Sequence, residues 1–311
     1  MTKEPQKITT AQWLMIGGLI LFMPFLAVVI SVLTHKPSSA PNLLEKYNIQ
    51  GMSGDTLTES DSVDGDVRAR YPDDRWDPKM LQILEEGPSL LSKQTELAVN
   101  LPPADDSGET KAGLDVLRRF AKTLRTPEQV ALIRAENEMV YMFEPFDKAG
   151  LFLSASNKET VNLLRTAQGE VGYFVVKAKR DFARVRPDAL APDLETVVDN
   201  PKHASYPSGH ATQGFMAALI LALVDPAHEK QYKALGYDIG LRREIAGVHY
   251  PSDSRAGRTL AQAVLDKLLE VPEFKEQLEK ARASFMAADE SSFESYVPVD
   301  TRAALRDGDK E

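Results

Sequence analysis

The sequence contains no cysteine among its 311 residues, which excludes disulfides and thiol chemistry. It also has no basic excess: its net charge of −9 argues against a general nucleic-acid binder. None of its five histidines stands at the spacing His-x3-His or His-Glu-x-x-His, so the usual signature of a zinc site is missing. Long runs of alternating apolar and polar residues, which would predict strands, are missing too, as are internal repeats.

One long apolar stretch is present, near the N-terminus. Residues 12–34 carry no formal charge and are long enough to cross a bilayer, and Trp13 suits the membrane interface. A cleaved signal peptide is the alternative, because residues 38–40 are small, but Pro41 follows directly and the apolar region is longer than usual. We therefore expect an uncleaved anchor or signal behind a short polar tail at residues 1–11. The flanking lysines are too balanced to predict its orientation.

The rest of the chain divides by composition into three parts. Residues 35–76 are rich in Ser, Asp, Gly and Pro without a sustained period, which predicts a flexible acidic spacer. Residues 77–286 carry apolar residues at the three- and four-residue steps of amphipathic helices. Residues 287–311 are polar and charged, and we expect a frayed tail. The predicted fold class is all-α, a compact helical bundle behind a single transmembrane helix and a spacer.

Two helix starts can be placed from their capping residues. Residues 126–129 have Pro at the first helical position and Gln where a capping box needs it. Residues 156–159 predict a second capping box, which opens a helix running toward Lys179 and stopped by Pro187. The apolar run at 215–224 is about half the length of a membrane span, so we expect a core helix.

The middle of the chain gathers residue types that bind a tetrahedral oxyanion. Lys179 and Arg186 stand seven positions apart, so a continuous helix would point them the same way. Arg binds phosphate in a bidentate manner and Lys binds it as a point charge. Arg243 supplies a third cation. Ser208 stands where a helix N-cap belongs, and Gly209 lets the backbone approach an anion closely.

Two histidines accompany these cations. His249 stands four residues before Asp253, and a carboxylate on one imidazole nitrogen makes the other a better nucleophile. His210 is then the candidate acid for a leaving group. Taken singly, these residues have commoner structural interpretations, such as a loop histidine or a solvated basic face. Their joint occurrence predicts an oxyanion site, in which His203 and Lys177 are assigned no role.

Three segments resemble the signature of the type 2 phosphatidic acid phosphatase superfamily: Lys179-x6-Arg186-Pro187, Pro207-Ser208-Gly209-His210 and Arg243-x5-His249-x3-Asp253. Within that superfamily, the chain is most similar to the bacterial class A non-specific acid phosphatases. That likeness extends to residues 101–107 and 204–206. The vanadium haloperoxidases belong to the same superfamily. The chain departs from the pattern at Arg242, where the family usually has Ser, so Arg242 either strengthens anion binding or points to solvent.

The resemblance implies a metal-independent phosphatase that hydrolyses phosphomonoesters through a phosphohistidine intermediate, with an acid-leaning pH optimum. It implies that His249 attacks phosphorus, that Asp253 orients it and that His210 protonates the leaving oxygen. The remaining motif residues would bind the phosphoryl oxygens: Lys179, Arg186, Ser208, Gly209 and Arg243. No metal or other cofactor is expected. Vanadate is expected to inhibit, and to act as a cofactor only in a haloperoxidase.

Other functions stay open at this point. One is a lipid or prenyl (pyro)phosphate phosphatase at the membrane surface, another is a vanadium-dependent haloperoxidase, and a third is a catalytically silent, membrane-tethered phosphate-binding protein. The expected partners are a phosphorylated small-molecule or lipid substrate and the membrane, but no nucleic acid, and a homo-oligomer is left open. The family implies a single-pass protein of the bacterial inner membrane with its catalytic domain on the periplasmic side.

Overall fold

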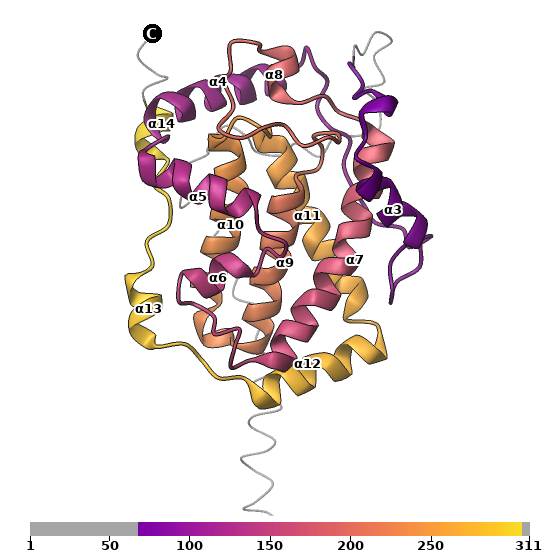
Figure 1. Ribbon diagram of the computed structural model, residues 1–311, viewed down its shortest axis with the longest axis vertical. Helices are drawn as coiled ribbons and strands as arrows, with labels where there is room; N and C mark the ends of the chain where they lie inside the picture. The colour runs from indigo at the N-terminus through magenta and orange to yellow at the C-terminus, as the bar shows by residue number, and fades with distance from the viewer. Residues whose placement is uncertain (1–67, 307–311) are drawn as a thin grey trace, which may run out of the picture. The chain divides into compact units, whose positions relative to one another are not determined.

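The computed structural model describes residues 68–306, and within them the backbone is helical, without a β-strand (Figure 1). The elements run in this order: η1 (Asp73–Arg75), α3 (Pro78–Glu86), α4 (Gly108–Thr123), α5 (Pro127–Asn137), α6 (Glu144–Lys148), α7 (Lys158–Phe182), α8 (Pro187–Leu190), α9 (Gly209–Val224), η2 (Pro226–His228), α10 (Glu229–Ile245), α11 (Pro251–Leu268), α12 (Pro272–Ser284), α13 (Glu290–Ser295) and α14 (Arg302–Arg306). The predicted all-α class is confirmed for this part of the chain.

The predicted membrane anchor at residues 12–34 lies outside the described residues, as do the tail at 1–11 and most of the predicted spacer. Between residues 68 and 306, no helix combines the length and the apolar character needed to cross a bilayer. The apolar run at 215–224 is part of α9, and Met216, Ile220 and Leu221 in it are fully buried. The prediction of a core helix there is confirmed, and each such side chain contributes about 1.5–3 kcal/mol by leaving water.

Helix α9 lies at the centre of the bundle, with α7, α10 and α11 packed around it (Figure 1). Small residues let α10 approach it closely. A Cβ atom added to Gly236 would stand 2.6 Å from Ala218 Cβ, and one added to Gly240 would stand 2.9 Å from Ala211 Cβ. Because η2 turns the chain back between the two helices, the start of α9 lies beside the end of α10.

Four helix ends meet at one end of this bundle, where α7 and α10 end and α9 and α11 begin (Figure 1). Ser208, the N-cap of α9, donates its backbone N–H to the carbonyl of Asp253 in the first turn of α11 at 3.0 Å. Lys179, in the last turn of α7, donates its ammonium to the carbonyls of Ala204 and Ser205 at 2.8 Å each. These bonds tie the loop before α9 to both neighbouring helices.

The predicted helix starts are confirmed in one case and wrong in its details in the other. Thr126 is the N-cap of α5, and its side chain accepts the Gln129 N–H as predicted. Asn157 is the N-cap of α7, but its side chain makes no capping bond. Its amide instead accepts the N–H of Met286 at 2.7 Å and donates to the Met286 carbonyl at 2.9 Å. The helix thus begins one residue later than the predicted box, and the side chain of its N-cap is bonded to a distant segment.

The end of α7 also differs from the prediction. The helix ends at Phe182, because Ala183 adopts a left-handed conformation with φ 49°, and Pro187 is not what stops it. Lys179 is therefore helical, whereas Arg186 lies in the following loop as the N-cap of α8. The expected continuous helix between these two cations does not exist. The short extended stretch that replaces it brings Arg186 back toward the bundle.

The end of the expected spacer packs on the helical unit. Trp76 is only 6% exposed and lies in an apolar cluster with Val176 and Ala204. Tyr71 donates its backbone N–H to the carbonyl of Ala183 at 2.6 Å, and the N–H of residue 77 bonds the carbonyl of residue 202 at 2.8 Å. The structure thus differs from the expected boundary at residue 76, because residues 70–76 are bound to the loops that carry the site motifs.

The expected frayed tail is wrong for residues 287–306. Phe293 in α13 is 2% exposed and stacks on His228 with ring centroids 3.6 Å apart. Tyr296 donates its hydroxyl to Asp238 at 2.6 Å. The prediction relied on the polar composition of this segment, but its aromatic side chains bind it to α10 and η2.

Replacing Trp76 with Ala is expected to lower the free energy of unfolding by about 3–5 kcal/mol, because a large buried side chain and its packing are lost. Urea-induced unfolding measures the change. The matched control is Val297→Ala, at a side chain that is 82% exposed, which should change stability by no more than about 0.5 kcal/mol. Equal unfolding midpoints for the Trp76 variant and the unmodified protein would contradict the inferred packing of residues 70–76.

Candidate active site

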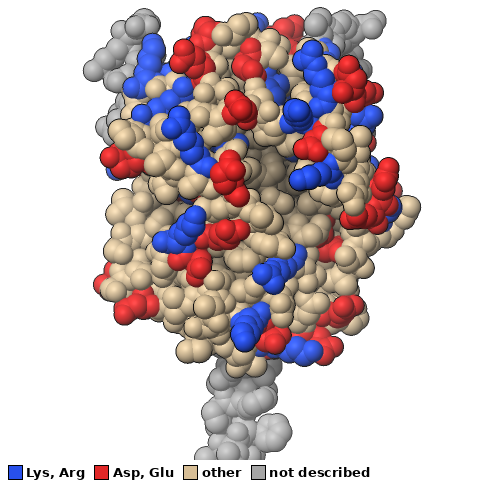
Figure 2. Space-filling model, viewed as in Figure 1, with Lys and Arg blue, Asp and Glu red and all other residues tan. Residues whose placement is uncertain are grey.

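The eight predicted site residues come together at the end of the bundle where the four helix ends meet. Lys179 comes from α7, Arg186 from the loop before α8 and Arg243 from the last turn of α10. These cations are 1–3% exposed. Figure 2 shows Lys, Arg, Asp and Glu interspersed over the face it draws, so the exposed charges of that face form no single basic patch. The cation cluster lies inside the protein.

Arg186 is held by backbone carbonyls and contacts two histidines. Its Nη1 donates to the carbonyl of Val248 at 2.8 Å and lies 3.2 Å from His249 Nε2. Its Nη2 lies 3.1 Å from His203 Nδ1. Burial lowers the pKa of Arg186 to about 10. His203, to which the sequence analysis assigned no role, is therefore in contact with the site.

Arg243 keeps most of its donors free. Its Nη2 donates to Asn137 Oδ1 at 3.1 Å, whereas its Nε and Nη1 have no hydrogen-bond partner among the described residues. Arg186 Nε and His210 Nε2 are likewise buried without a partner in residues 68–306. Buried polar atoms are nearly always paired. A cluster of unpartnered N–H groups from cations therefore marks a place where an anionic ligand fits.

Arg242, whose role the sequence left between anion binding and solvent, does neither. Its Nε lies 2.9 Å from both carboxylate oxygens of Glu136, and its Nη2 lies 2.6 Å from one of them. Both side chains are buried. The pair joins α10 to α5 directly beside Arg243, so Arg242 supports the site without facing it.

His249 and Asp253, four positions apart in the chain, are hydrogen-bonded to each other. His249 Nδ1 lies 3.0 Å from Asp253 Oδ2, and Arg186 lies on the side of Nε2. An arginine can only donate, so this arrangement fits the tautomer with the proton on Nδ1 and the lone pair on Nε2. Burial first and Arg186 second hold the pKa of His249 well below its usual range. The imidazole is therefore neutral, which is the form that a nucleophile would need.

The Asp253 carboxylate is fully buried and binds several groups. Its Oδ2 accepts the Ser205 hydroxyl at 2.5 Å and the Tyr250 N–H at 3.2 Å, while its Oδ1 accepts from Arg184 at 2.7 Å. Burial acts to raise the pKa of Asp253, but Arg184 and then His249 outweigh it and lower the pKa below its usual range. Asp253 is thus ionised wherever His249 is neutral.

The start of α9 supplies the remaining predicted residues. Ser208 is fully buried, and its hydroxyl oxygen accepts the Ala211 N–H at 3.4 Å, which leaves its proton free to donate. An added Cβ on Gly209 would meet only Val175 Cγ1, at 3.8 Å, so packing alone does not require glycine there. His210 follows in the first turn. Its ring is hydrogen-bonded to the backbone of Glu136, and Nε2 is the nitrogen left without a partner.

His210 is neutral when no anion is bound. Burial, followed by the charges of Arg243 and His249, holds its pKa well below the usual range. An anion placed among the cations opposes these effects and raises the pKa values of both histidines. Anion binding and proton uptake are therefore coupled in this site.

The sequence analysis missed four contributing residues: Asn137, Arg184, His203 and Ser205. A signal for Arg184 was present, since it stands two positions before Arg186 in a segment that the structure shows as extended. Side chains two positions apart in extended backbone point the same way. That signal depended on α7 ending at Phe182, which the periodicity did not reveal.

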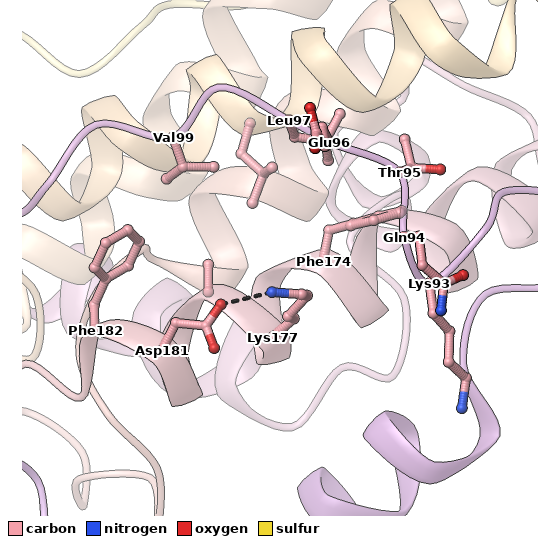
Figure 3. Close-up of a pocket in the computed structure, with 12 residues that line it drawn as sticks. Lys93, Gln94, Thr95, Glu96, Leu97, Val99, Phe174, Lys177, Asp181 and Phe182 are labelled. Carbon is pink, nitrogen blue, oxygen red and sulfur yellow. Dashed lines mark hydrogen bonds and ion pairs between the residues drawn. The ribbon is translucent and has the colours of Figure 1, made fainter.

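A separate cavity of about 490 Å³ lies between the segment at 93–99 and α7 (Figure 3). None of the eight predicted site residues lines it. In Figure 3, Lys177 and Asp181 point toward each other across its edge and form an ion pair of 2.7 Å. The cavity presents paired charges, whereas the cation cluster presents unpartnered ones. The cluster is therefore the better candidate site.

Comparison with known proteins agrees with the three motifs. Residues 164–267, which contain all eight predicted site residues, match the model of the PAP2 superfamily, so the predicted resemblance is confirmed. A non-specific acid phosphatase of Providencia stuartii is 35% identical over 115 residues, which are 35% of this chain and 45% of that protein. A second, of Salmonella typhimurium, is 33% identical over 131 residues, 40% of this chain and 52% of that protein.

A third relative differs in its named substrate. The decaprenylphosphoryl-5-phosphoribose phosphatase of Mycobacterium tuberculosis is 35% identical over 106 residues, which are 30% of this chain and 53% of that protein. The chain spans about half the length of the curated relatives it matches.

Inorganic phosphate is expected to stabilise the protein, because its negative charge balances the positive charges of the buried cations. At about 100 times its dissociation constant it should raise Tm by roughly 5–10 °C. Thermal unfolding at constant ionic strength, with chloride in place of phosphate as the reference, measures the shift. Arg243→Ala should lose the shift and Arg118→Ala, at a surface ion pair, should retain it. An undiminished shift in Arg243→Ala would place the phosphate elsewhere.

Proposed function

We propose that the protein is a phosphatase that hydrolyses phosphomonoesters through a phosphohistidine intermediate. One observation carries the proposal: the Nε2 lone pair of a neutral, Asp253-oriented His249 lies within a cluster of buried cations that have unpartnered donors. Similarity to the two non-specific acid phosphatases supports it. The activity is proposed for the catalytic unit, since the similarity covers only part of those proteins.

Substrate binding follows from the charges. The phosphoryl oxygens are bound by Lys179, Arg186 and Arg243, together with the Ser208 hydroxyl and the N–H groups at the start of α9. Lys179 uses two of its three donors on carbonyls and keeps the third. A helix N-terminus favours an anion because of its free N–H groups and its dipole. The same contacts stabilise the charge that spreads over the equatorial oxygens in the transition state.

The chemical step uses the two histidines in turn. Nε2 of His249 forms a bond to phosphorus while the bond from phosphorus to the leaving oxygen breaks, and protonated His210 gives its proton to that oxygen. His210 then takes a proton from the water that attacks the phosphohistidine, which releases phosphate and restores His249. We propose that these steps need no metal ion, because the three cations supply the positive charge.

A lipid or prenyl phosphate substrate is the second candidate function. The named substrate of the Mycobacterium tuberculosis relative favours it, and so does the anchor expected at residues 12–34. With that anchor, we propose a single-pass protein of the bacterial inner membrane whose catalytic unit faces the periplasm. Water-soluble and membrane-bound phosphate esters would both reach such a site.

The protein is expected to hydrolyse p-nitrophenyl phosphate near pH 5 in the presence of excess chelator, and vanadate is expected to inhibit it. His249→Ala should abolish turnover, because the nucleophile is lost. The matched control, His228→Asn, should keep its activity. His228 lies beyond the far end of α9, whose 16 residues span about 24 Å, and is therefore far from the site. Substantial activity in the His249 variant would contradict the mechanism.

The same assay separates the other functions. Hydrolysis of prenyl phosphates in vesicles but not of p-nitrophenyl phosphate would favour the lipid enzyme. Peroxide-dependent halide oxidation after addition of vanadate would favour a haloperoxidase. Phosphate binding without either activity would indicate a silent binding protein.

His210→Ala is expected to slow the hydrolysis of alkyl phosphates by about 10²–10⁴-fold, the usual contribution of a general acid. The loss with p-nitrophenyl phosphate should be much smaller, because that leaving group needs little protonation. Because the pKa of His210 in the free enzyme is depressed by burial and by Arg243, kcat/KM should fall as pH rises from the acid side toward neutrality. The basic limb of kcat, where bound phosphate raises that pKa, should lie at higher pH. Equal losses on both substrates would contradict the role of His210 as acid.

A further inference from the structure

Arg184 is a fourth buried cation of the site, and the proposed mechanism gives it no task. It is 3% exposed and stands in the extended segment between α7 and α8, where its backbone forms an isolated antiparallel β-bridge with Arg70. Its Nη1 donates to Asp253 Oδ1 at 2.7 Å and to Ser252 Oγ at 2.8 Å. Its Nη2 donates to Thr110 Oγ1 at 3.0 Å. The bonds of this guanidinium thus run to Asp253 and its surroundings, whereas those of Arg186 run to the two histidines.

The aromatic ring of Tyr250 fixes the plane of this guanidinium. The guanidinium carbon of Arg184 lies 3.8 Å from the centroid of the Tyr250 ring, within the range of a cation–π contact. Tyr250 also supplies the backbone N–H that bonds Asp253 Oδ2. The same residue therefore orients Arg184 on one side and the carboxylate on the other.

The two oxygens of Asp253 have separate partners as a result. Oδ1 accepts from Arg184, whereas Oδ2 accepts from His249 Nδ1, from the Ser205 hydroxyl and from the Tyr250 N–H. A carboxylate held at one oxygen alone can rotate about its Cβ–Cγ bond and exchange its oxygens. With Arg184 on Oδ1, the orientation in which Oδ2 meets His249 is the one that satisfies both ends.

The N-terminal part of α4 holds Arg184 in turn. Thr110 Oγ1 accepts from Arg184 and donates its own proton to the carbonyl of Ala104 at 2.7 Å. This links the segment at 101–107, whose likeness to the class A acid phosphatases had no structural explanation in the sequence, to the site. The segment thus acts on the site through Arg184.

We propose that Arg184 is a positioning residue that holds Asp253 ionised and oriented, so that His249 keeps its proton on Nδ1 and presents its Nε2 lone pair to phosphorus. The proposal rests on the proposed function for its kinetic consequences, but not for its structural ones. Lys is a partial substitute at this position. Its single nitrogen can reach Asp253, but it lacks the planar fork that also binds Thr110 and stacks on Tyr250.

The test compares Arg184→Gln and Arg184→Lys with the matched control Arg118→Gln, a half-exposed arginine that makes two bonds to Asp193. In Arg184→Gln, kcat should fall by roughly 10–100-fold, as it does when the outer hydrogen-bond partner of a metal-bound histidine is removed. KM and the phosphate-induced rise in Tm should stay unchanged, because Arg184 does not bind the anion. Arg184→Lys should recover part of kcat.

The pH profile separates positioning from a general loss of structure. At low pH, kcat should also fall, because protonation of His249 or Asp253 removes the nucleophile. In Arg184→Gln this acid limb of kcat should move to higher pH, because Asp253 loses the cation that most opposes its protonation. A loss of active protein that is the same at every pH would scale kcat equally and leave the limb in place, so the comparison is made where circular dichroism shows the variant folded. An unmoved limb, or a loss of phosphate stabilisation equal to that of Arg243→Ala, would overturn the proposal.

A readout without turnover distinguishes this proposal from the proposed function. Nitrogen-15 NMR of labelled histidine should find His249 protonated on Nδ1 in the unmodified protein and in Arg118→Gln. It should find a mixture of tautomers in Arg184→Gln, with the Nδ1 form partly restored in Arg184→Lys. If the unmodified protein hydrolyses no phosphate ester but the His249 tautomer changes in Arg184→Gln, the positioning role of Arg184 is supported and the proposed phosphatase function is contradicted. If hydrolysis is found but the His249 proton stays on Nδ1 in both Arg184 variants, the positioning role is contradicted. Should the Gln variant not fold, the Lys variant alone decides between these outcomes.

Discussion

Buried cations outnumber buried carboxylates at the site, and most of the site depends on this imbalance of charge. Lys179, Arg184, Arg186 and Arg243 are each 1–3% exposed, and the Asp253 carboxylate beside Arg184 is fully buried. Taking an ion out of water costs several kcal/mol even after relaxation. Fixed backbone carbonyls offset part of this cost, and a bound anion would offset the rest. Burial depresses the pKa values of Lys179, Arg186 and both site histidines, and the neighbouring cations add to that effect.

Helix packing is what makes such a cluster rigid enough to hold its charges. The glycines of α10 let it approach α9 closely, so that the end of one helix stands beside the start of the other. The carbonyls that bind Lys179 and Arg186 come from loops that are themselves tied to helix ends. Even residues 70–77 contribute, because they are bonded to the loops before α8 and α9. The site is therefore preorganised by elements from most of the described chain.

Charge also couples the two histidines to their ligand. Without a bound anion both imidazoles are neutral, which suits the role of nucleophile proposed for His249 but not the role of acid proposed for His210. A bound phosphoryl group would raise both pKa values, so the proposed acid would gain its proton as the substrate binds. Asp253, kept ionised by Arg184, makes the two histidines unequal: His249 is fixed in one tautomer, whereas His210 keeps a free Nε2.

The sequence by itself determined the all-α class of the described residues, the core position of α9, the caps at Thr126 and Ser208, and the residue types of the oxyanion site. These features depend on neighbours a few positions away, which periodicity and motif spacing record. Only the tertiary structure decided how each buried arginine is paired. Arg242 forms an ion pair with Glu136, 106 positions earlier in the chain, and Arg184 forms one with Asp253, 69 positions later. Likewise, Trp76 and Phe293 are buried by segments far from them in the chain. Burial and pairing depend on such distant partners, and local sequence carries no record of them.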